Sequence, residues 1–491
     1  MSTLSPALLA ADTPTTPGLS PDALLLIAVA GVAALLLMIM KAKIEPFVAL
    51  VVVSIGVALA AGVPAADLVA TIEEGMGSTL GHIATIIALG AMVGRIIELS
   101  GGAAALAHSL IDRFGKKRTP LALTATGFLL GIPVFFEVGL IILMPIVYGV
   151  ARASRKPLLV YALPMGAAML TVHAFLPPHP GAVAAATAVG AQQGWILLFG
   201  IPLTAVVILL GYLMARRITR RTYPMAPEIA AKVYGDEAGP DGMESAGDNP
   251  DAGARSGLSE SAGQAVENPP SFAMVASLIL TPIVLILLGT IGTNALPEGN
   301  TLRAVLTVLG APMVALLIAA ALSAYFLGAR RGWSRQHIGQ VMASALPGVA
   351  MVILVAGAGG VFGKVLVKTG IGNAVADLLD RTGLPLLLLA FVIAMLLRAV
   401  QGSTTVALVT TAGLVTPLLQ RADLSPQQLA LVCLAMGAGG LSLSHVNDAG
   451  YWMFTKLVGL DVGTGLRTWT VLTTAMGVTG FALTAALWQV V

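Results

Sequence analysis

The chain has 491 residues, of which 57% are hydrophobic and 10% are charged, and its mean hydropathy is +0.91. Soluble domains carry about 25% charged residues, so the composition excludes an ordinary water-soluble protein and predicts an all-α polytopic membrane protein. The net charge of +3 is typical of basic cytoplasmic loops rather than of nucleic-acid binding. The single cysteine, Cys433, excludes an internal disulfide framework and a cysteine-based metal cluster.

The chain divides into a tail, two membrane regions and a linker. Residues 1–20 contain no Lys or Arg, unlike a secretory signal, and form an N-terminal tail. Residues 21–219 and 271–491 are expected to form a first and a second membrane region. Residues 220–270 are polar and rich in Gly, Ser, Asp and Glu, which predicts a disordered cytoplasmic linker. Uncharged runs long enough to span a bilayer occupy residues 23–40, 47–65, 193–215, 271–293, 304–329 and 468–491.

The two membrane regions resemble each other and are interpreted as repeats. Four positions of the first region match four of the second at a constant offset: Gly90, Gly94, Arg95 and Gly101 match Gly359, Gly363, Lys364 and Gly370. Each set precedes an apolar stretch with one polar interruption and then a long span broken by a histidine-containing motif. These broken helices are predicted at about residues 158–191 and 427–459.

The apolar stretches are predicted to be re-entrant hairpins, at about residues 119–151 and 384–420. Basic clusters flank the first stretch on both sides, so a single span would break the positive-inside rule. Two full spans need about 40 apolar residues, whereas arms of about a dozen residues reach about 18 Å, near the midplane. The second stretch has sparse flanking charges, which suit the periplasm. We therefore expect ten spans, both termini outside, and an inverted repeat of the kind found in secondary transporters.

Two candidate site residues lie in the first repeat. Glu137 is the only ionisable residue of the first hairpin, in the predicted turn at residues 131–139. An intramembrane carboxylate is functional by default, although a structural hydrogen-bonding role is the alternative. His179 lies in a break at residues 176–181 that contains three prolines. Its imidazole can bind hydroxyl groups or a proton.

The second repeat supplies the remaining candidates, in a hairpin turn at residues 398–405 and a break at residues 442–450. Polar side chains and backbone N–H groups in the turn suit a carboxylate ligand. The turn offers Gln401, Gly402, Ser403, Thr404 and Thr405, and the break offers His445, Asn447 and Asp448. Arg398 is equally compatible with binding the substrate carboxylate and with pairing to Glu137, Asp448 or lipid headgroups.

Other histidines and a metal site receive no functional role. His82, His108, His173 and His337 are interpreted as structural or loop residues. The candidate ligands lie on four separate elements without the spacing of a zinc protease motif, so no metal site is predicted. The sequence also lacks a glycine-rich phosphate-binding motif, which disfavours an ATP-driven pump.

Four motifs resemble the gluconate permease (GntP) family of the ion-transporter superfamily: FFEVGLIILMPI, LPPHPGAVAAA, RAVQGSTTVALVTTAG and LSHVNDAGYW. The resemblance covers the chain apart from the N-terminal tail and the linker, which is longer than the family's pattern. It implies a permease of the bacterial inner membrane, not an enzyme, that takes up gluconate, a related aldonate, D-serine or another small hydroxy acid by proton symport. It also implies an elevator-type carrier whose hairpin-bearing domain moves against a homodimeric scaffold.

We therefore expect proton-coupled uptake of gluconate or a related small sugar-acid or hydroxy-acid anion, with membrane lipid as the surrounding partner. Helix N-termini would bind the carboxylate, while Ser403, Thr404, His179 and Asn447 would bind hydroxyl groups. Moving an anion against the membrane potential costs about 2.3 kcal/mol per charge per 100 mV, which a coupled proton cancels. Glu137 is favoured as proton carrier over Asp448. No cofactor is expected. Na⁺ coupling and a D-serine or glycerate permease are alternatives, and an anion channel or a membrane sensor would be a different class.

Overall fold

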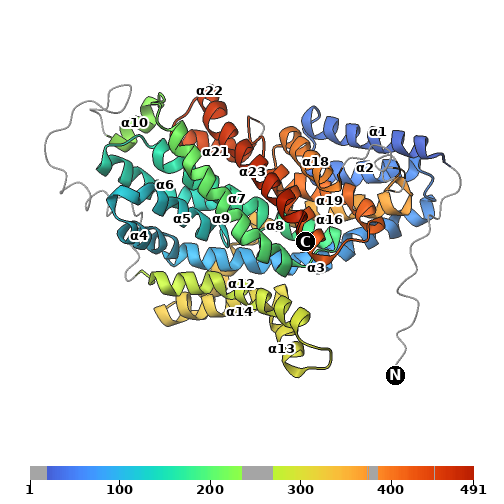
Figure 1. Cartoon of the computed structure of the whole chain (residues 1–491), viewed down its shortest axis with the longest axis horizontal. Helices are drawn as coiled ribbons and strands as arrows, with labels where there is room; N and C mark the ends of the chain where they lie inside the picture. The colour runs from blue at the N-terminus through green and yellow to red at the C-terminus, as the bar shows by residue number, and fades with distance from the viewer. Residues whose placement is uncertain (1–18, 235–268, 373, 375–376, 378–384, 447) are drawn as a thin grey trace.

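The computed structural model describes residues 19–234, 269–372, 374, 377, 385–446 and 448–491, and all regular elements in these ranges are helices. Asn447, most of the predicted N-terminal tail and residues 235–268 of the predicted linker lie outside them. Figure 1 shows the helices in chain order. The helices α1 and α2 lie along one edge, and α12, α13 and α14 lie along another.

The described residues before position 235 contain ten α-helices, of which nine lie in the first region and the last, α10, lies in the predicted linker. They are α1 (Pro21–Met40), α2 (Pro46–Ala60), α3 (Ala65–Leu99), α4 (Gly102–Phe114), α5 (Thr119–Gly131), α6 (Phe136–Ser154), α7 (Leu159–Phe175), α8 (Pro180–Val189), α9 (Gln193–Ile218) and α10 (Pro227–Tyr234).

The described part of the second region is also made of helices. It contains α12 (Phe272–Ala295), α13 (Thr301–Leu309), α14 (Pro312–Ser323), α15 (Arg335–Ala343), α16 (Pro347–Lys368), α18 (Leu386–Gln401), α19 (Thr404–Arg421), α20 (Pro426–Leu441), α21 (Ala449–Val458), α22 (Val462–Gly465) and α23 (Val471–Trp488). A π-helical segment, Leu466–Thr470, leads directly into α23.

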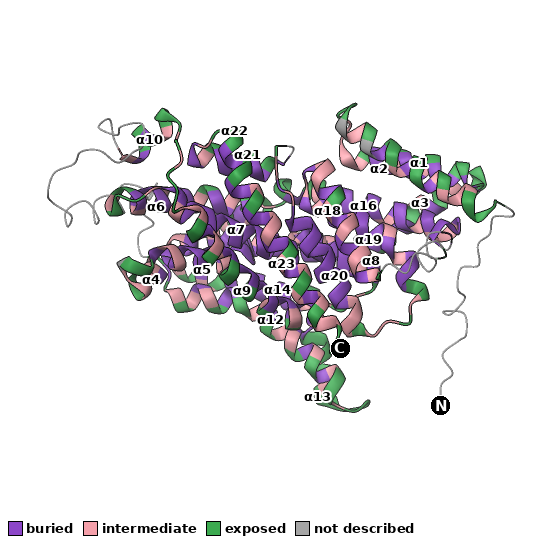
Figure 2. Ribbon diagram, turned by 45° about the horizontal axis from the view of Figure 1, so that its top comes forward, coloured by how far each residue is buried: buried purple, intermediate pink, exposed green. Residues whose placement is uncertain are grey.

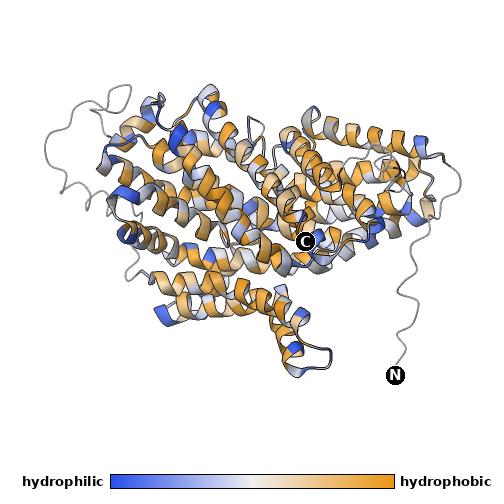
Figure 3. Cartoon of the chain, in the orientation of Figure 1, coloured by the Kyte–Doolittle hydropathy of each residue, from blue (hydrophilic) through white to orange (hydrophobic). Residues whose placement is uncertain are grey.

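Nine helical segments in the described ranges are long and apolar enough to cross a membrane. They are Pro21–Ile39, Ala65–Leu99, Phe136–Ser154, Leu159–Val189, Gln193–Ile218, Phe272–Ala295, Pro312–Arg331, Pro347–Lys368 and Val462–Trp488. Figure 3 shows hydrophobic residues along most of these helices and hydrophilic residues mainly at their ends and connections. Two helices, α2 and α20, are shorter than these candidate spans. The helix α6, which was expected to be a hairpin arm, is long enough to cross the membrane. The expected number of ten spans therefore stays a prediction.

The two broken helices form the centre of the fold. Nearly every residue of α7 is buried, and so is every residue of α20 from Ala430 to Leu441. They pack closely, because a Cβ at Gly437 would lie 2.5 Å from the carbonyl oxygen of Ala174. Figure 2 shows this concentration of buried residues in the middle of the molecule, with exposed faces on α1 and α13.

The breaks follow from local sequence. Prolines at 177, 178 and 180 end α7 and begin α8, with Pro180 at the first helical position where its missing N–H is harmless. Gly402 ends α18 in a left-handed conformation, with φ of 76°, that favours glycine. Ser403 then caps α19 by accepting a hydrogen bond from the N–H of Val406.

Three expectations about these elements need correction. The apolar run at residues 304–329 is not one helix, because Gly310 packs against Gly289 and Pro312 begins a new helix after it. The predicted linker is helical at Pro227–Tyr234, where α10 is held by a hydrogen bond from the N–H of Ala226 to the carbonyl of Gly459. The helices in the predicted hairpin arms, α5, α6, α18 and α19, contain 13, 19, 16 and 18 residues, mostly more than the expected dozen.

The close packing of α18 against α20 predicts a strong effect of one methyl group. In Gly439→Ala the new Cβ would lie 2.3 Å from the carbonyl oxygen of Phe391. We expect this overpacking to lower stability by about 1–3 kcal/mol, measured as a lower melting temperature of the detergent-purified protein.

The matched control is Gly339→Ala in α15, where a Cβ meets no atom within 4 Å. Alanine is the better helix former there by about 1 kcal/mol, so the control should melt at or above the wild-type temperature. Unchanged melting of Gly439→Ala would contradict the α18–α20 packing.

Candidate functional site

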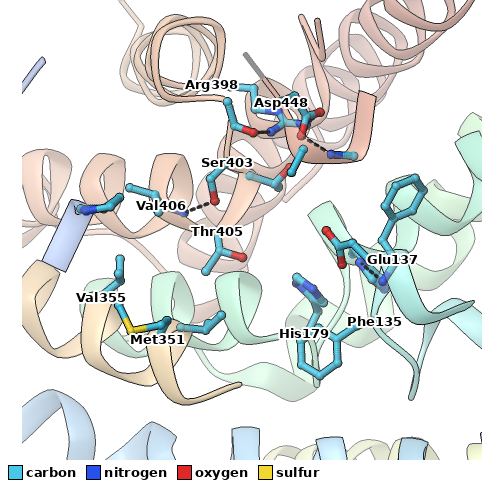
Figure 4. Close-up of a pocket in the computed structure, with 18 of the residues that line it drawn as sticks. Phe135, Glu137, His179, Met351, Val355, Arg398, Ser403, Thr405, Val406 and Asp448 are labelled. Atoms are coloured by element: carbon cyan, nitrogen blue, oxygen red, sulfur yellow. Dashed lines mark hydrogen bonds and ion pairs between the residues drawn. The ribbon is translucent and has the colours of Figure 1, made fainter. Parts of the chain in front are cut away.

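A cavity of about 400 Å³ lies where five helices begin, namely α2, α6, α8, α19 and α21. Its lining includes the N-cap residues of α6, α8, α19 and α21, which are Phe135, His179, Ser403 and Asp448. In Figure 4 these residues surround a common space together with Glu137 and Thr405. Helix N-termini carry partial positive charge and unpaired N–H groups. Their convergence favours an anionic ligand.

A buried ion pair joins the two breaks of the second membrane region. Arg398, near the end of α18, forms an ion pair with Asp448 and also donates a hydrogen bond to the carbonyl of Gly402. The two side chains are only 2% and 7% exposed. The sequence left several partners open for Arg398, and in the structure its ion-pair partner is Asp448. Because the positive charge is already compensated, Arg398 mainly connects α18–α19 to α20–α21.

Asp448 is held by further hydrogen bonds. Its carboxylate accepts a hydrogen bond from the N–H of Gly450 at 2.9 Å, which caps α21, and another from the hydroxyl of Ser444. Ser444 in turn accepts one from the indole N–H of Trp469 at 2.8 Å. The network therefore extends from the cavity to the π-helical segment before α23 and fixes the orientation of Asp448.

His173 makes the corresponding connection in the first membrane region. This buried side chain of α7 accepts a hydrogen bond from the N–H of Phe136 through Nδ1, at 3.2 Å. Its Nε2 lies 2.8 Å from the carbonyl oxygen of Val134. The imidazole ring also stacks on that of His179, with centroids 4.1 Å apart. The sequence interpretation left His173 as structural because histidine inside an apolar helix gives no signal of its partners.

Glu137 lies in the first turn of α6 with its side chain exposed towards the cavity. The described residues provide it with no ion pair, in contrast to Asp448. The apolar ring of Phe135 lines the cavity on one side, and the apolar residues Met351 and Val355 of α16 line another part. An uncompensated carboxyl group therefore faces the space where an anion would bind.

Glu45 also lines the cavity, and the sequence analysis missed it. Its carboxylate caps α2 by accepting hydrogen bonds from the N–H groups of Phe47 and Val48, at 2.8 and 3.3 Å. The signal was present as a carboxylate directly before Pro46, a common helix start. It pointed only to capping, because the proximity of α2 to the hairpins is a tertiary feature.

The cavity brings together most of the candidate residues. Those that line it are Glu137, His179, Arg398, Gly402, Ser403, Thr404, Thr405 and Asp448. His445 and Gln401 are not among the lining residues, since His445 is bonded to the carbonyl of Ala399 at 2.9 Å. The hydroxyl group of Thr404 already donates a hydrogen bond to the carbonyl oxygen of Gly440, so its hydrogen is not free for a ligand.

Several polar atoms at the breaks are buried without a partner in the described structure. They are Nδ1 of His179, Nε of Arg398 and both amide atoms of Gln401. Such groups are costly unless a ligand, water or a second conformation satisfies them, so they support a binding role for this region. The described residues contain no group of three or more His, Cys, Asp or Glu side chains placed to bind a metal ion.

The solved structures most relevant to the fold are two transporters with low sequence identity. The Alcanivorax borkumensis YdaH transporter superposes with a TM-score of 0.58 at 15% identity, covering 91% of this chain and 98% of that chain. Neisseria gonorrhoeae MtrF gives a TM-score of 0.56 at 14% identity, covering 91% and 96%. These likenesses establish the fold.

Sequence comparisons establish the family. The inner membrane permease YgbN of Escherichia coli is 48% identical, over 96% of this chain and all of its own length. The gluconate permease of Bacillus licheniformis is 37% identical, over 94% and 99%. The Gnt-II system L-idonate transporter of Escherichia coli is 38% identical, over 93% and 97%. Since the GntP family permease profile also matches residues 23–491, this chain is a multi-pass inner-membrane permease that belongs to the GntP family.

Proposed function

We propose that this permease takes up gluconate or a closely related sugar-acid anion together with at least one proton. The observation that carries this proposal is the convergence of five helix N-termini on one cavity beside an uncompensated carboxyl group, Glu137. The names of two relatives, a gluconate permease and an L-idonate transporter, support a six-carbon sugar acid as substrate.

The carboxylate of the substrate is assigned to the N-termini of α19 and α21. Their first turns supply N–H groups near Ser403 and Asp448, and the adjacent Arg398 offers one unused donor, Nε. The ion pair with Asp448 keeps Arg398 from acting as an isolated positive charge. Recognition by partial charges suits a carrier, because it binds an anion firmly enough to select it and weakly enough to release it.

The hydroxyl groups of the substrate are assigned to neutral polar side chains around the same cavity. Thr405 offers a hydroxyl group and His179 an unpartnered buried Nδ1. The volume of about 400 Å³ is within the range of small-molecule sites. A polyhydroxy monocarboxylate matches this combination of one anion receptor and several neutral partners.

Proton coupling is assigned to Glu137. An ionised Glu137 would repel a substrate anion in the same low-dielectric cavity, whereas the protonated form would not. Binding of the proton and of the anion therefore favour each other, and this linkage is reciprocal. Asp448 is the weaker candidate because its carboxylate is already engaged by Arg398, Ser444 and Gly450.

The breaks at residues 132–135 and 402–403 are proposed to be the tips of re-entrant hairpins from opposite membrane faces. Each break leads into a helix whose N-terminus lines the cavity. On this basis we also propose the inverted repeat, elevator-type movement of the hairpin-bearing part, and a homodimeric scaffold embedded in lipid.

Uptake into proteoliposomes tests the function directly. Labelled gluconate should accumulate when the outside is acidic relative to the inside, because the proton gradient then drives the symport. A sodium gradient alone should give no accumulation. Accumulation driven only by sodium would replace the proton with Na⁺, and preference for D-serine or glycerate over gluconate would change the substrate class.

Glu137→Gln tests the coupling in the same assay. The amide mimics the protonated carboxyl group, so accumulation driven by the proton gradient should be lost while exchange of labelled for unlabelled gluconate continues. Glu45→Gln is the matched control, because Glu45 also lines the cavity but its carboxylate caps α2. Wild-type accumulation in Glu137→Gln would exclude Glu137 as the proton carrier.

Thr405→Val tests the substrate contacts, because it removes one hydroxyl group and preserves the shape of the side chain. Gluconate binding should weaken by about 1–2 kcal/mol, the value of a lost hydrogen bond, measured by calorimetry. Thr411→Val on the same helix is the control, since its hydroxyl donates to the carbonyl of Ala407 and lies outside the cavity lining. Equal binding by both variants would place the hydroxyl contacts elsewhere.

Cysteine labelling tests the first hairpin. In a Cys433→Ala background, cysteines at Lys117 and Arg152 should both react only from the cytoplasm, and one at Asp423 only from the periplasm, as the charge distribution predicts. Reaction of the first two positions from opposite faces would show that residues 119–151 cross the membrane and would remove the inverted repeat.

A further inference from the structure

We propose that His173 is a positioning residue that holds the first-repeat half of the site together, so that Glu137 and His179 keep a fixed relative arrangement. The inference rests on the proposed function of the cavity, but its geometry is independent of the substrate. One buried imidazole bridges the break between α5 and α6 and stacks on the residue at the break between α7 and α8.

The hydrogen bonds determine the state of the ring. The N–H of Phe136 is a donor, so Nδ1 of His173 must accept and carry no proton. Nε2 must then carry the hydrogen, which it donates to the carbonyl oxygen of Val134 at 2.8 Å. A neutral imidazole in this tautomer satisfies one backbone donor and one backbone acceptor on the two sides of Phe135. A backbone break inside a membrane protein requires such satisfaction.

The stacking of His173 on His179 connects the break between α5 and α6 to the break between α7 and α8. The rings of His173 and His179 are 4.1 Å apart and inclined by 22°. Phe135 contacts both edgewise, with centroid separations of 6.4 Å to His173 and 5.8 Å to His179. The α6 N-terminus that carries Glu137 and the α8 N-terminus that begins after His179 are thus attached to one buried side chain.

In the second repeat, a charged side chain connects the two breaks. There Arg398 joins the carbonyl of Gly402 at one break to Asp448 at the other. His173 is the neutral counterpart of Arg398, and each ties a hairpin break to a broken-helix break within its own repeat. Loss of His173 should therefore loosen the α5–α6 break locally while leaving the second repeat in place.

Thiol labelling measures that loosening without any substrate. Val134→Cys places a reporter at a buried position of the break, 4% exposed, and keeps the backbone carbonyl that accepts from His173. The native Cys433, buried in α20, reports loosening of the whole core in the same molecule. Mass spectrometry distinguishes the two labelled peptides.

We expect His173→Gln and His173→Leu to raise the labelling rate of Cys at position 134 several-fold, with the rate at Cys433 unchanged. His173→Asn, whose amide can reach only the Nδ1 side, should give a smaller increase. His108→Gln on α4 is the matched control, because His108 is half-buried and lies outside the cavity lining. Should His173→Leu fail to fold, the Gln and Asn variants carry the test.

Transport supplies the second readout. In His173→Gln the gluconate concentration for half-maximal uptake should rise about fivefold, the equilibrium effect of one lost hydrogen bond, with a smaller change in the maximal rate. An unchanged labelling rate at position 134, or an equal increase at Cys433, would overturn the positioning role. If the protein does not transport sugar acids, the uptake readout fails while the labelling result still stands, so the two failures are distinguishable.

Discussion

The buried pair between Arg398 and Asp448 is the interaction on which the arrangement of the second membrane region depends. Two helices are interrupted here within one packed core, and interrupted helices leave backbone carbonyl and N–H groups without partners. Arg398 satisfies the carbonyl of Gly402, while Asp448 satisfies the N–H of Gly450. Removing one partner of such a buried pair typically costs about 3–5 kcal/mol, because the other charge is left uncompensated. The pair therefore makes the break structurally possible.

This compensation shapes the electrostatics of the cavity. With Arg398 and Asp448 neutralising each other, the charges that remain along the lining are the carboxyl groups of Glu45 and Glu137. Glu45 is stabilised by two backbone N–H groups of α2, whereas Glu137 has no ion pair among the described residues. The partial positive charges of the helix N-termini thus act in the cavity without a competing full positive charge, and under the proposed function the protonation state of Glu137 would set how strongly an anion binds there.

The positions of the breaks could be predicted from the sequence, but the contacts that stabilise them could not. The breaks are predicted by the prolines at 177, 178 and 180 and by Gly402 before Ser403, because these residues restrict the local backbone conformation. The pairing of Arg398 with Asp448 and the role of His173 depend on which helices become neighbours. For the same reason the sequence did not predict Glu45 as a site residue. It did predict His445 and Gln401, which lie outside the cavity lining. The division of residues 304–329 had a local signal in Pro312, which begins α14, whereas the close approach of Gly310 to Gly289 is a tertiary contact.

The two connections, made by Arg398 with Asp448 and by His173, differ in strength, and this difference affects which helices can move relative to one another. A guanidinium–carboxylate pair is strongly directional and is stable only when both groups stay together, so α18–α19 and α20–α21 should move as one unit. The imidazole of His173 attaches its two breaks by two neutral hydrogen bonds and ring contacts, which are individually weaker. A carrier must open and close around its ligand, and the weaker tie lies in the half that carries Glu137. We therefore expect the α5–α6 break to adjust more readily than the α18–α19 break, and under the proposed function the break fixed by Arg398 and Asp448 would be the more rigid part of the anion site.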